Sequence, residues 1–188
     1  MNPQESALVQ LAQNLDRAGL PYMVIGGMAN AVWGVSRATL DVDATIWTDR
    51  DPAELIPVFD GPFRVRPSDP AAFVRQTRVL PLGTHEGVRL DLVFGQLPYE
   101  QEAIQRAIIR DVSGTPVRFC TAEDLVLMKL VSSRPRDRED VHGILVTRGT
   151  TLDLAYLSPR VDELADLLER PEIRDDYRRW LTESRAGQ

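Results

Sequence analysis

Two kinds of hydrophobic spacing alternate along the amino-terminal part of the chain. Apolar residues at helical spacing, as in 4–18, alternate with runs of β-forming residues, as in "YMVI" and "VRLDLVFG". The spacing predicts strands over 22–25, 39–47, 78–82 and 88–95, and helices over 4–18, 28–34, 48–59, 69–77 and 98–109. A hairpin is predicted over 110–120, with its turn at Ser113-Gly114. This part is therefore expected to be an α/β structure.

The composition turns helical after this hairpin. Helices are predicted over 121–133, 136–148, 161–170 and 173–184. We therefore predict an α/β domain over 1–119 and a helical domain over 120–188, with no flexible linker between them.

Net charge and cysteine content indicate which ligands and which cellular compartment suit the protein. The 188-residue chain has a formal net charge of −6, which argues against nonspecific binding of nucleic acid over the whole surface. Its one cysteine, Cys120, excludes an intramolecular disulfide and fits a reducing compartment. No signal peptide and no apolar run of the roughly 20 residues that a membrane helix needs are expected. We expect a cytoplasmic protein without a membrane partner.

Two carboxylates stand two residues apart in one predicted strand. The alternation of a strand places Asp41 and Asp43 on the same face. Like charges side by side repel unless a cation lies between them. The alternative is that both carboxylates face solvent.

A glycine pair precedes this strand. Gly26 and Gly27 lie between a predicted strand and a predicted helix, where helix amides without partners can bind phosphate. Glycine permits close approach of a ligand to the backbone. An ordinary turn would also account for the pair.

A third acid, Asp91, is the only one in the apolar segment "VRLDLVFG". Acids in such surroundings are rare unless they are paired or bind a metal ion. If this strand lies beside that of Asp41 and Asp43, three carboxylates converge on a cation such as Mg²⁺, an arrangement that suits two-metal phosphoryl chemistry. The alternative is an ion pair between Asp91 and Arg89 or Arg37.

The segment "VIGGMANAVWGVSRATLDVDATIW" resembles the signature of the DNA polymerase β-like nucleotidyltransferases. The finer pattern is similar to the AbiEii-type toxin nucleotidyltransferases and to the lincosamide and aminoglycoside nucleotidyltransferases; its residues are Gly34, Arg37, Thr39, Asp41 and Asp43. The later segment "EDLVLMKLVSSRPRDREDVHGIL" resembles the AbiEii-like group as well. The resemblance implies a mixed sheet flanked by helices, followed by a helical part.

The resemblance also implies roles for the glycines and the acids. Gly26 and Gly27 would cradle the triphosphate of an NTP. Asp41 and Asp43 would bind both metal ions, Mg²⁺ or Mn²⁺. Asp91 would bind the catalytic metal ion and help to activate the acceptor hydroxyl.

Two basic residues are weaker candidates for nucleotide binding. By the resemblance Lys129 would contact phosphate, although it could also be a surface lysine whose stem lies along apolar neighbours. Arg37 could bind phosphate with two nitrogens or pair with Asp41. We assign no role to His85 or His142.

The function that the resemblance implies is transfer of a nucleotide from an NTP to a hydroxyl on tRNA, a protein or a small molecule. A toxin paired with a cognate antitoxin is the first expectation, and an antibiotic-modifying enzyme is the second. The alternatives are a catalytically silent relative that binds a nucleotide or a partner, and a purely structural protein.

Overall fold

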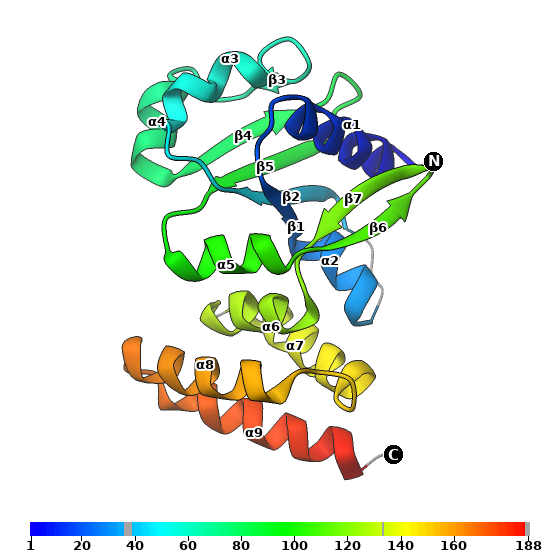
Figure 1. Cartoon of the computed structure of the whole chain (residues 1–188), viewed down its shortest axis with the longest axis vertical. Helices are drawn as coiled ribbons and strands as arrows, with labels where there is room; N and C mark the ends of the chain where they lie inside the picture. Colours follow the sequence, from blue (N-terminus) through cyan, green and yellow to red (C-terminus); the bar gives the residue numbers. More distant parts are fainter. Residues whose placement is uncertain (36–38, 133, 187–188) are drawn as a thin grey trace. The chain divides into compact units, whose positions relative to one another are not determined.

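The computed structural model describes residues 1–35, 39–132 and 134–186, and it forms two compact units (Figure 1). The first unit holds the described residues of 1–28 and 38–120, and the second holds those of 29–37 and 121–188. Helix α2 (Gly26–Trp33) therefore contributes residues to both units. The division predicted at residue 119 omits this, because residues 29–35 group with the later helices.

The first unit is built on a seven-stranded sheet in the order β3-β4-β5-β2-β1-β7-β6 (Figure 1). Its strands are β1 (Tyr22–Ile25), β2 (Asp41–Ile46), β3 (Arg64–Val65), β4 (Val79–Gly83), β5 (Arg89–Phe94), β6 (Ile108–Val112) and β7 (Thr115–Phe119). β2 runs parallel to β5 and β1 runs parallel to β7, whereas the other neighbouring strands are antiparallel. The predicted mixed α/β fold is confirmed.

Helices accompany this sheet in the first unit. They are α1 (Pro3–Arg17), the 3-10 helix η1 (Pro52–Leu55), α3 (Ile56–Phe59), α4 (Pro70–Thr77) and α5 (Pro98–Arg106). α1 contacts β2 and β7, α5 contacts β1 and β2, and α4 contacts β4. α1 begins at a capping box, in which the side chains of Asn2 and Glu5 each accept a hydrogen bond from the backbone amide of the other.

The two faces of the central strands differ in polarity. Alternate residues of β2 and β5 are buried in the core, namely Val42, Ala44, Ile46, Leu90, Leu92 and Phe94. The residues between them at the start of each strand are charged and partly or fully exposed, namely Asp41, Asp43, Arg89 and Asp91. The period-two pattern thus places the core on one face and the charged groups on the other.

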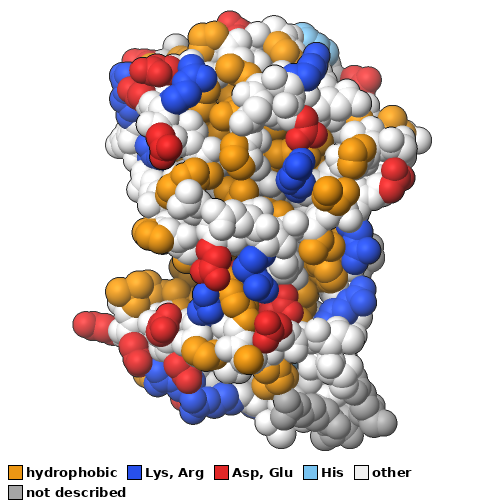
Figure 2. All heavy atoms as spheres, in the orientation of Figure 1, with side chains coloured by type: hydrophobic (Ala, Val, Ile, Leu, Met, Phe, Trp, Pro, Cys, Tyr) orange, Lys and Arg blue, Asp and Glu red, His pale blue; other side chains and the backbone are white. Residues whose placement is uncertain are grey.

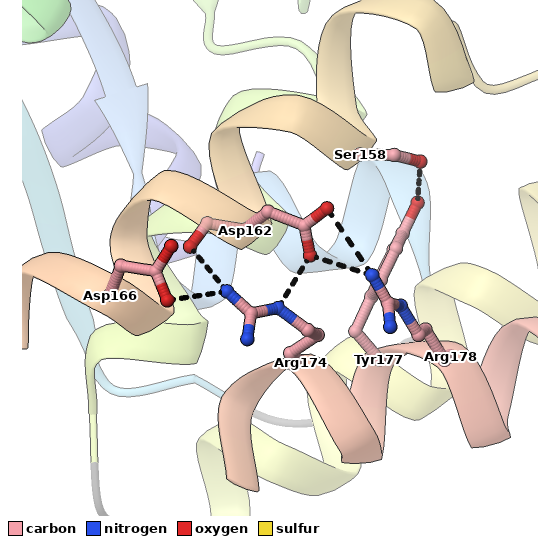
Figure 3. Close-up of polar contacts among 6 residues, drawn as sticks. All are labelled: Ser158, Asp162, Asp166, Arg174, Tyr177 and Arg178. Atoms are coloured by element: carbon pink, nitrogen blue, oxygen red, sulfur yellow. Dashed lines mark hydrogen bonds and ion pairs between the residues drawn. The ribbon is translucent and has the colours of Figure 1, made fainter. Parts of the chain in front are cut away.

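The second unit contains helices α6 (Ala122–Val131), α7 (Pro135–Arg148), α8 (Leu154–Leu167) and α9 (Pro171–Ala186). α6 packs on α7 and α8, and α9 packs on α7 and α8. Polar bonds also join α8 to α9 (Figure 3): Arg174 lies between Asp162 and Asp166, and the hydroxyl groups of Ser158 and Tyr177 are 2.9 Å apart.

Two predicted boundaries were wrong. The helix predicted over 98–109 ends at Arg106, because the backbone of Ala107 turns to an extended conformation and β6 begins at Ile108. The helix predicted from residue 161 begins at Leu154 instead. The Asp153 side chain caps it by accepting from the Tyr156 amide, and Pro159 is accommodated within it.

The surface carries charges of both signs. On the face drawn in Figure 2, acidic and basic side chains are interspersed with hydrophobic ones. Over the described parts of the chain, no helix combines the length and the apolar character needed to cross a membrane.

Candidate active site

The three acidic residues singled out in the sequence lie on two adjacent strands. β2 and β5 are parallel, with Asp43 opposite Asp91 and Asp41 opposite Arg89. Side chains at paired positions of neighbouring strands point to the same face, as do residues two apart in one strand. The three carboxylates therefore share one face of the sheet with the guanidinium group of Arg89.

Asp41 has Arg89 as its counter-ion. The Arg89 Nε donates to Asp41 Oδ1 at 2.8 Å, and Nη2 donates to Oδ2 at 3.3 Å. Both side chains are open to solvent, with 57% of Arg89 and 40% of Asp41 exposed. Among the described residues, no three acidic, histidine or cysteine side chains are grouped so that they could hold a metal ion. The carboxylates of Asp41, Asp43 and Asp91 therefore do not converge on one cation position with their side chains in the present conformation.

The chemistry of the donor set nevertheless fits a hard divalent cation. Carboxylate oxygens are the ligands that Mg²⁺ and Mn²⁺ prefer. Asp43 and Asp91 face each other across the strand pair, and a divalent cation between them would offset the repulsion of two like charges. An exposed ion pair contributes little stability, so Asp41 can leave Arg89 and join them at small cost.

The pKa of the Asp91 carboxyl group differs from that of an ordinary surface aspartate. Burial raises the pKa of Asp91, the charge of Asp41 raises it further, and Arg89 and Arg66 act in the opposite direction. Asp91 is nevertheless an exposed residue, so the raised pKa reflects partial desolvation of the carboxyl group and not complete enclosure. A carboxylate with a raised pKa is a better proton acceptor near neutral pH.

The glycine pair lies directly beside Asp43. Ile25, the last residue of β1, pairs with Asp43, and Gly26 follows with φ +64°. A Cβ atom on Gly26 would overlap the Asp43 carboxylate, and one on Gly27 would lie 2.5 Å from the Thr39 Oγ1. A side chain at either position would therefore force its neighbour to move, and the first amides of α2 start next to the Asp43 carboxylate.

Lys129 lies in the helical unit, where two carboxylates hold its ammonium group. Its side chain is only 6% exposed, and Nζ donates to Asp140 Oδ2 at 2.7 Å and to Asp137 Oδ1 at 3.0 Å. Asp140 also accepts from the Asn30 Nδ2 at 3.2 Å, and Asp137 accepts from the Ser132 hydroxyl at 2.6 Å. The predicted contact between Lys129 and phosphate stays a prediction, and these contacts give the residue a structural role.

Arg89 and Asn30 have contacts that the sequence did not predict. Arg89, the predicted alternative counter-ion of Asp91, pairs with Asp41 instead. Asn30 is fully buried and donates to both Asp140 and the Val35 carbonyl. The signal was an amide in the otherwise apolar helix "MANAVW". Arg37 lies outside the described residues, and its predicted phosphate contact stays a prediction.

A comparison with protein families identifies the chain. The family profile described as "Nucleotidyltransferase of unknown function (DUF6036)" matches residues 4–185. The chain belongs to the DUF6036 family. A comparison with curated protein sequences finds no match. The family description supports nucleotidyltransferase activity, as the superfamily resemblance implied.

Solved structures share the fold of this DUF6036 member. An antigenic nucleotidyltransferase-like protein from Paracoccidioides brasiliensis is 18% identical, with a TM-score of 0.56, over 93% of this chain and 92% of that one. ANT(2")-Ia in complex with adenylyl-2"-tobramycin is 17% identical, with a TM-score of 0.60, over 89% and 99%. The lincosamide antibiotic adenylyltransferase LnuA, lincomycin-bound, is 11% identical, with a TM-score of 0.51, over 77% and 96%. The AbiEii-type resemblance is not confirmed by these matches.

Proposed function

We propose that this chain transfers a nucleotidyl group from an NTP to a hydroxyl group of a small molecule, with Mg²⁺ as the cofactor. The observation that carries the proposal is the facing pair of Asp43 and Asp91 beside the Gly26 turn. The pair offers oxygen ligands for a divalent cation, and the turn leads into helix amides that can bind phosphate. Nucleotidyl transfer needs both features at one place.

The proposed site residues have different roles in the reaction. Amides at Gly26 and Gly27 would bind the triphosphate, and Asp41, Asp43 and Asp91 would hold the metal. When bound, Mg²⁺ supplies neutralisation of charge at the reacting phosphate. The acceptor oxygen forms a bond to the α-phosphorus, the bond from this phosphorus to the bridging oxygen breaks, and pyrophosphate leaves. The acceptor hydroxyl loses its proton as the new bond forms, and Asp91 would help to remove it.

Two observations favour a small acceptor. The net charge of −6 and the interspersed surface charges of Figure 2 disfavour a large polyanion such as RNA. Two structures of similar fold contain small molecules, namely adenylyl-2"-tobramycin in ANT(2")-Ia and lincomycin in LnuA. The second candidate is transfer to tRNA or protein by a toxin that a cognate antitoxin controls. It rests on the AbiEii-like pattern that includes Gly34 and Thr39.

Transfer of labelled nucleotide tests the proposal. The protein is incubated with each α-labelled NTP, Mg²⁺ and three separate acceptor sets: hydroxyl-bearing small molecules, total tRNA and a protein extract. We expect label on a small molecule. Asp43→Asn and Asp91→Asn should each lower transfer by at least about 100-fold, since even groups behind the metal ligands contribute 10- to 100-fold.

Asp49→Asn is the matched control, because Asp49 is an exposed aspartate shortly after β2 and outside the ligand set. Its transfer rate should stay near that of the wild type. Label on tRNA or protein alone would replace the small-molecule acceptor with the second candidate. Binding of NTP without transfer to any acceptor would identify a catalytically silent relative.

A further inference from the structure

Arg89 completes a square of charged groups on the open face of the sheet. Asp41 and Asp43 form one side on β2, and Arg89 and Asp91 form the other side on β5. Three corners are the proposed metal ligands, and the fourth corner is a cation supplied by the protein itself. None of the proposed steps of nucleotidyl transfer uses this arginine.

The ion pair occupies Asp41 in a way that competes with a metal ion. Two nitrogens of Arg89 engage the two oxygens of the Asp41 carboxylate, at 2.8 Å and 3.3 Å. A metal ion placed on these oxygens would have to displace the guanidinium group. The exposure of both side chains keeps the pair weak, so a ligand that offers Arg89 another anion can open it.

A triphosphate is an anion of this kind. Guanidinium groups bind phosphate oxygens with two parallel hydrogen bonds, as they bind a carboxylate. A bare divalent cation offers no such exchange and meets the positive charge of Arg89 beside its ligands. A metal ion bound to a nucleotide brings the replacement anion with it.

We propose that Arg89 makes metal binding depend on the nucleotide. In the absence of nucleotide Arg89 holds Asp41, and on arrival of the metal–nucleotide complex it exchanges the carboxylate for a phosphate oxygen. Asp41 then becomes available as a metal ligand. Arg89 is thus a positioning residue that limits unproductive binding of metal alone. The inference rests on the proposed function, because it requires the metal to bind at Asp41, Asp43 and Asp91.

Mn²⁺ binding tests the inference without any turnover. Free Mn²⁺ is measured by electron paramagnetic resonance, with and without an ATP analogue that has a methylene bridge between its α- and β-phosphates. Arg89→Gln should bind Mn²⁺ alone about two- to fivefold more tightly than the wild type, the range that loss of a weak exposed ion pair implies. The same variant should bind the Mn²⁺–analogue complex more weakly than the wild type. Arg89→Lys keeps the positive charge but loses the two-nitrogen geometry of the guanidinium group. Its affinities should therefore lie between those of the wild type and Arg89→Gln.

Arg66→Gln is the matched control. Arg66 is an exposed arginine whose charge acts on Asp91 at a distance, but its side chain is not the counter-ion of Asp41. This variant should leave both affinities near those of the wild type. Equal gains in affinity for Mn²⁺ alone in Arg66→Gln and Arg89→Gln would overturn the inference, because the effect would then be one of general charge.

Unchanged Mn²⁺ binding in Arg89→Gln would also overturn the inference. Asp43→Asn separates this failure from failure of the proposed function. If Asp43→Asn loses Mn²⁺ binding while Arg89→Gln resembles the wild type, the metal site stands and only the role of Arg89 is rejected. If Asp43→Asn binds Mn²⁺ as well as the wild type does, the metal site and the role of Arg89 both fall.

Discussion

Replacement of Lys129 by Met should destabilise the helical unit without weakening the nucleotide site. Met keeps the apolar stem of the side chain but removes the ammonium group that Asp137 and Asp140 share. A contact with nucleotide phosphate, which the sequence resemblance implies for Lys129, predicts the opposite balance of effects. The substitution therefore distinguishes a structural lysine from a substrate-binding one.

The size of the effect follows from what each carboxylate loses. Removing one partner of a buried ion pair costs about 3–5 kcal/mol, because the other charge stays buried. The side chain of Asp140 is only 6% exposed and keeps the amide of Asn30 at 3.2 Å, whereas that of Asp137 is 17% exposed and keeps the Ser132 hydroxyl at 2.6 Å. These remaining hydrogen bonds place the expected loss near the lower end, at about 3 kcal/mol.

Urea unfolding provides the stability measurement. The buried Trp180 lies in the helical unit and reports its transition by fluorescence, and the two units of the chain are fitted as separate transitions where they unfold apart. Arg178→Met is the control in the same unit, since Arg178 is 62% exposed and pairs with Asp162 at 3.0 Å (Figure 3). It should cost less than about 1 kcal/mol.

A double variant isolates the ion pair itself. Combining Lys129→Met with Asp140→Asn removes both charges, so the loss should be smaller than the sum of the two single losses. Nucleotide affinity, measured by calorimetry under conditions in which every variant is folded, should be unchanged. A loss of stability below about 1 kcal/mol, together with a tenfold weaker nucleotide affinity, would refute the structural reading and assign Lys129 to the phosphate.

Three further results are expected. Gly26→Ala should cost about 1–3 kcal/mol more than Gly19→Ala in urea unfolding, because both glycines have φ +64° but only a Cβ on Gly26 meets the Asp43 carboxylate; equal losses would exclude the clash. Mg²⁺ should raise the melting temperature of the wild type by mass action and should have little effect on Asp43→Asn; equal gains would place the ion elsewhere. Burial alone would raise the pKa of Asp137, but the Ser132 and Lys129 hydrogen bonds outweigh it and lower the pKa below 3.8. Asp137 should therefore stabilise the fold fully above pH 3.8, and this stabilisation should vanish as the pH falls through the lowered pKa of the folded state. Asp137→Asn should thus be less stable than the wild type above pH 3.8 and similar to it in strong acid; a difference that persists in acid would contradict this assignment.

Local sequence patterns were sufficient to predict an element whose conformation depends mainly on its own residues. Alternation in "LDVDATI" predicts a strand with both acids on one face, and β2 has this form. The turn signal Ser113-Gly114 predicts the hairpin of β6 and β7, and both residues have positive φ.

The predicted end of a helix was wrong where a helical pattern and a strand pattern overlap in the sequence. Ala107, Ile108 and Ile109 continue the apolar spacing of the preceding helix, but the two isoleucines are also good strand formers, and their pairing with β7 decides in favour of the strand. α8 begins at Leu154 and not at the predicted residue 161, and Pro159 lies between these two positions. The helix nevertheless contains this proline in its second turn, and the Asp153 cap stabilises its first turn.

The composition of the site depends on the register between β2 and β5, which no local pattern reveals. β3, β4 and their helices separate the two strands in the chain, and a shift of one residue would move Asp91 to the opposite face. The observed register places Asp43 opposite Asp91, and it thereby fixes Arg89 opposite Asp41. The same pairing that brings two proposed metal ligands together therefore supplies the third with a counter-ion. A sequence motif can identify the acids, but the register between β2 and β5 gives Asp41 an arginine that it has to release before it can bind a metal.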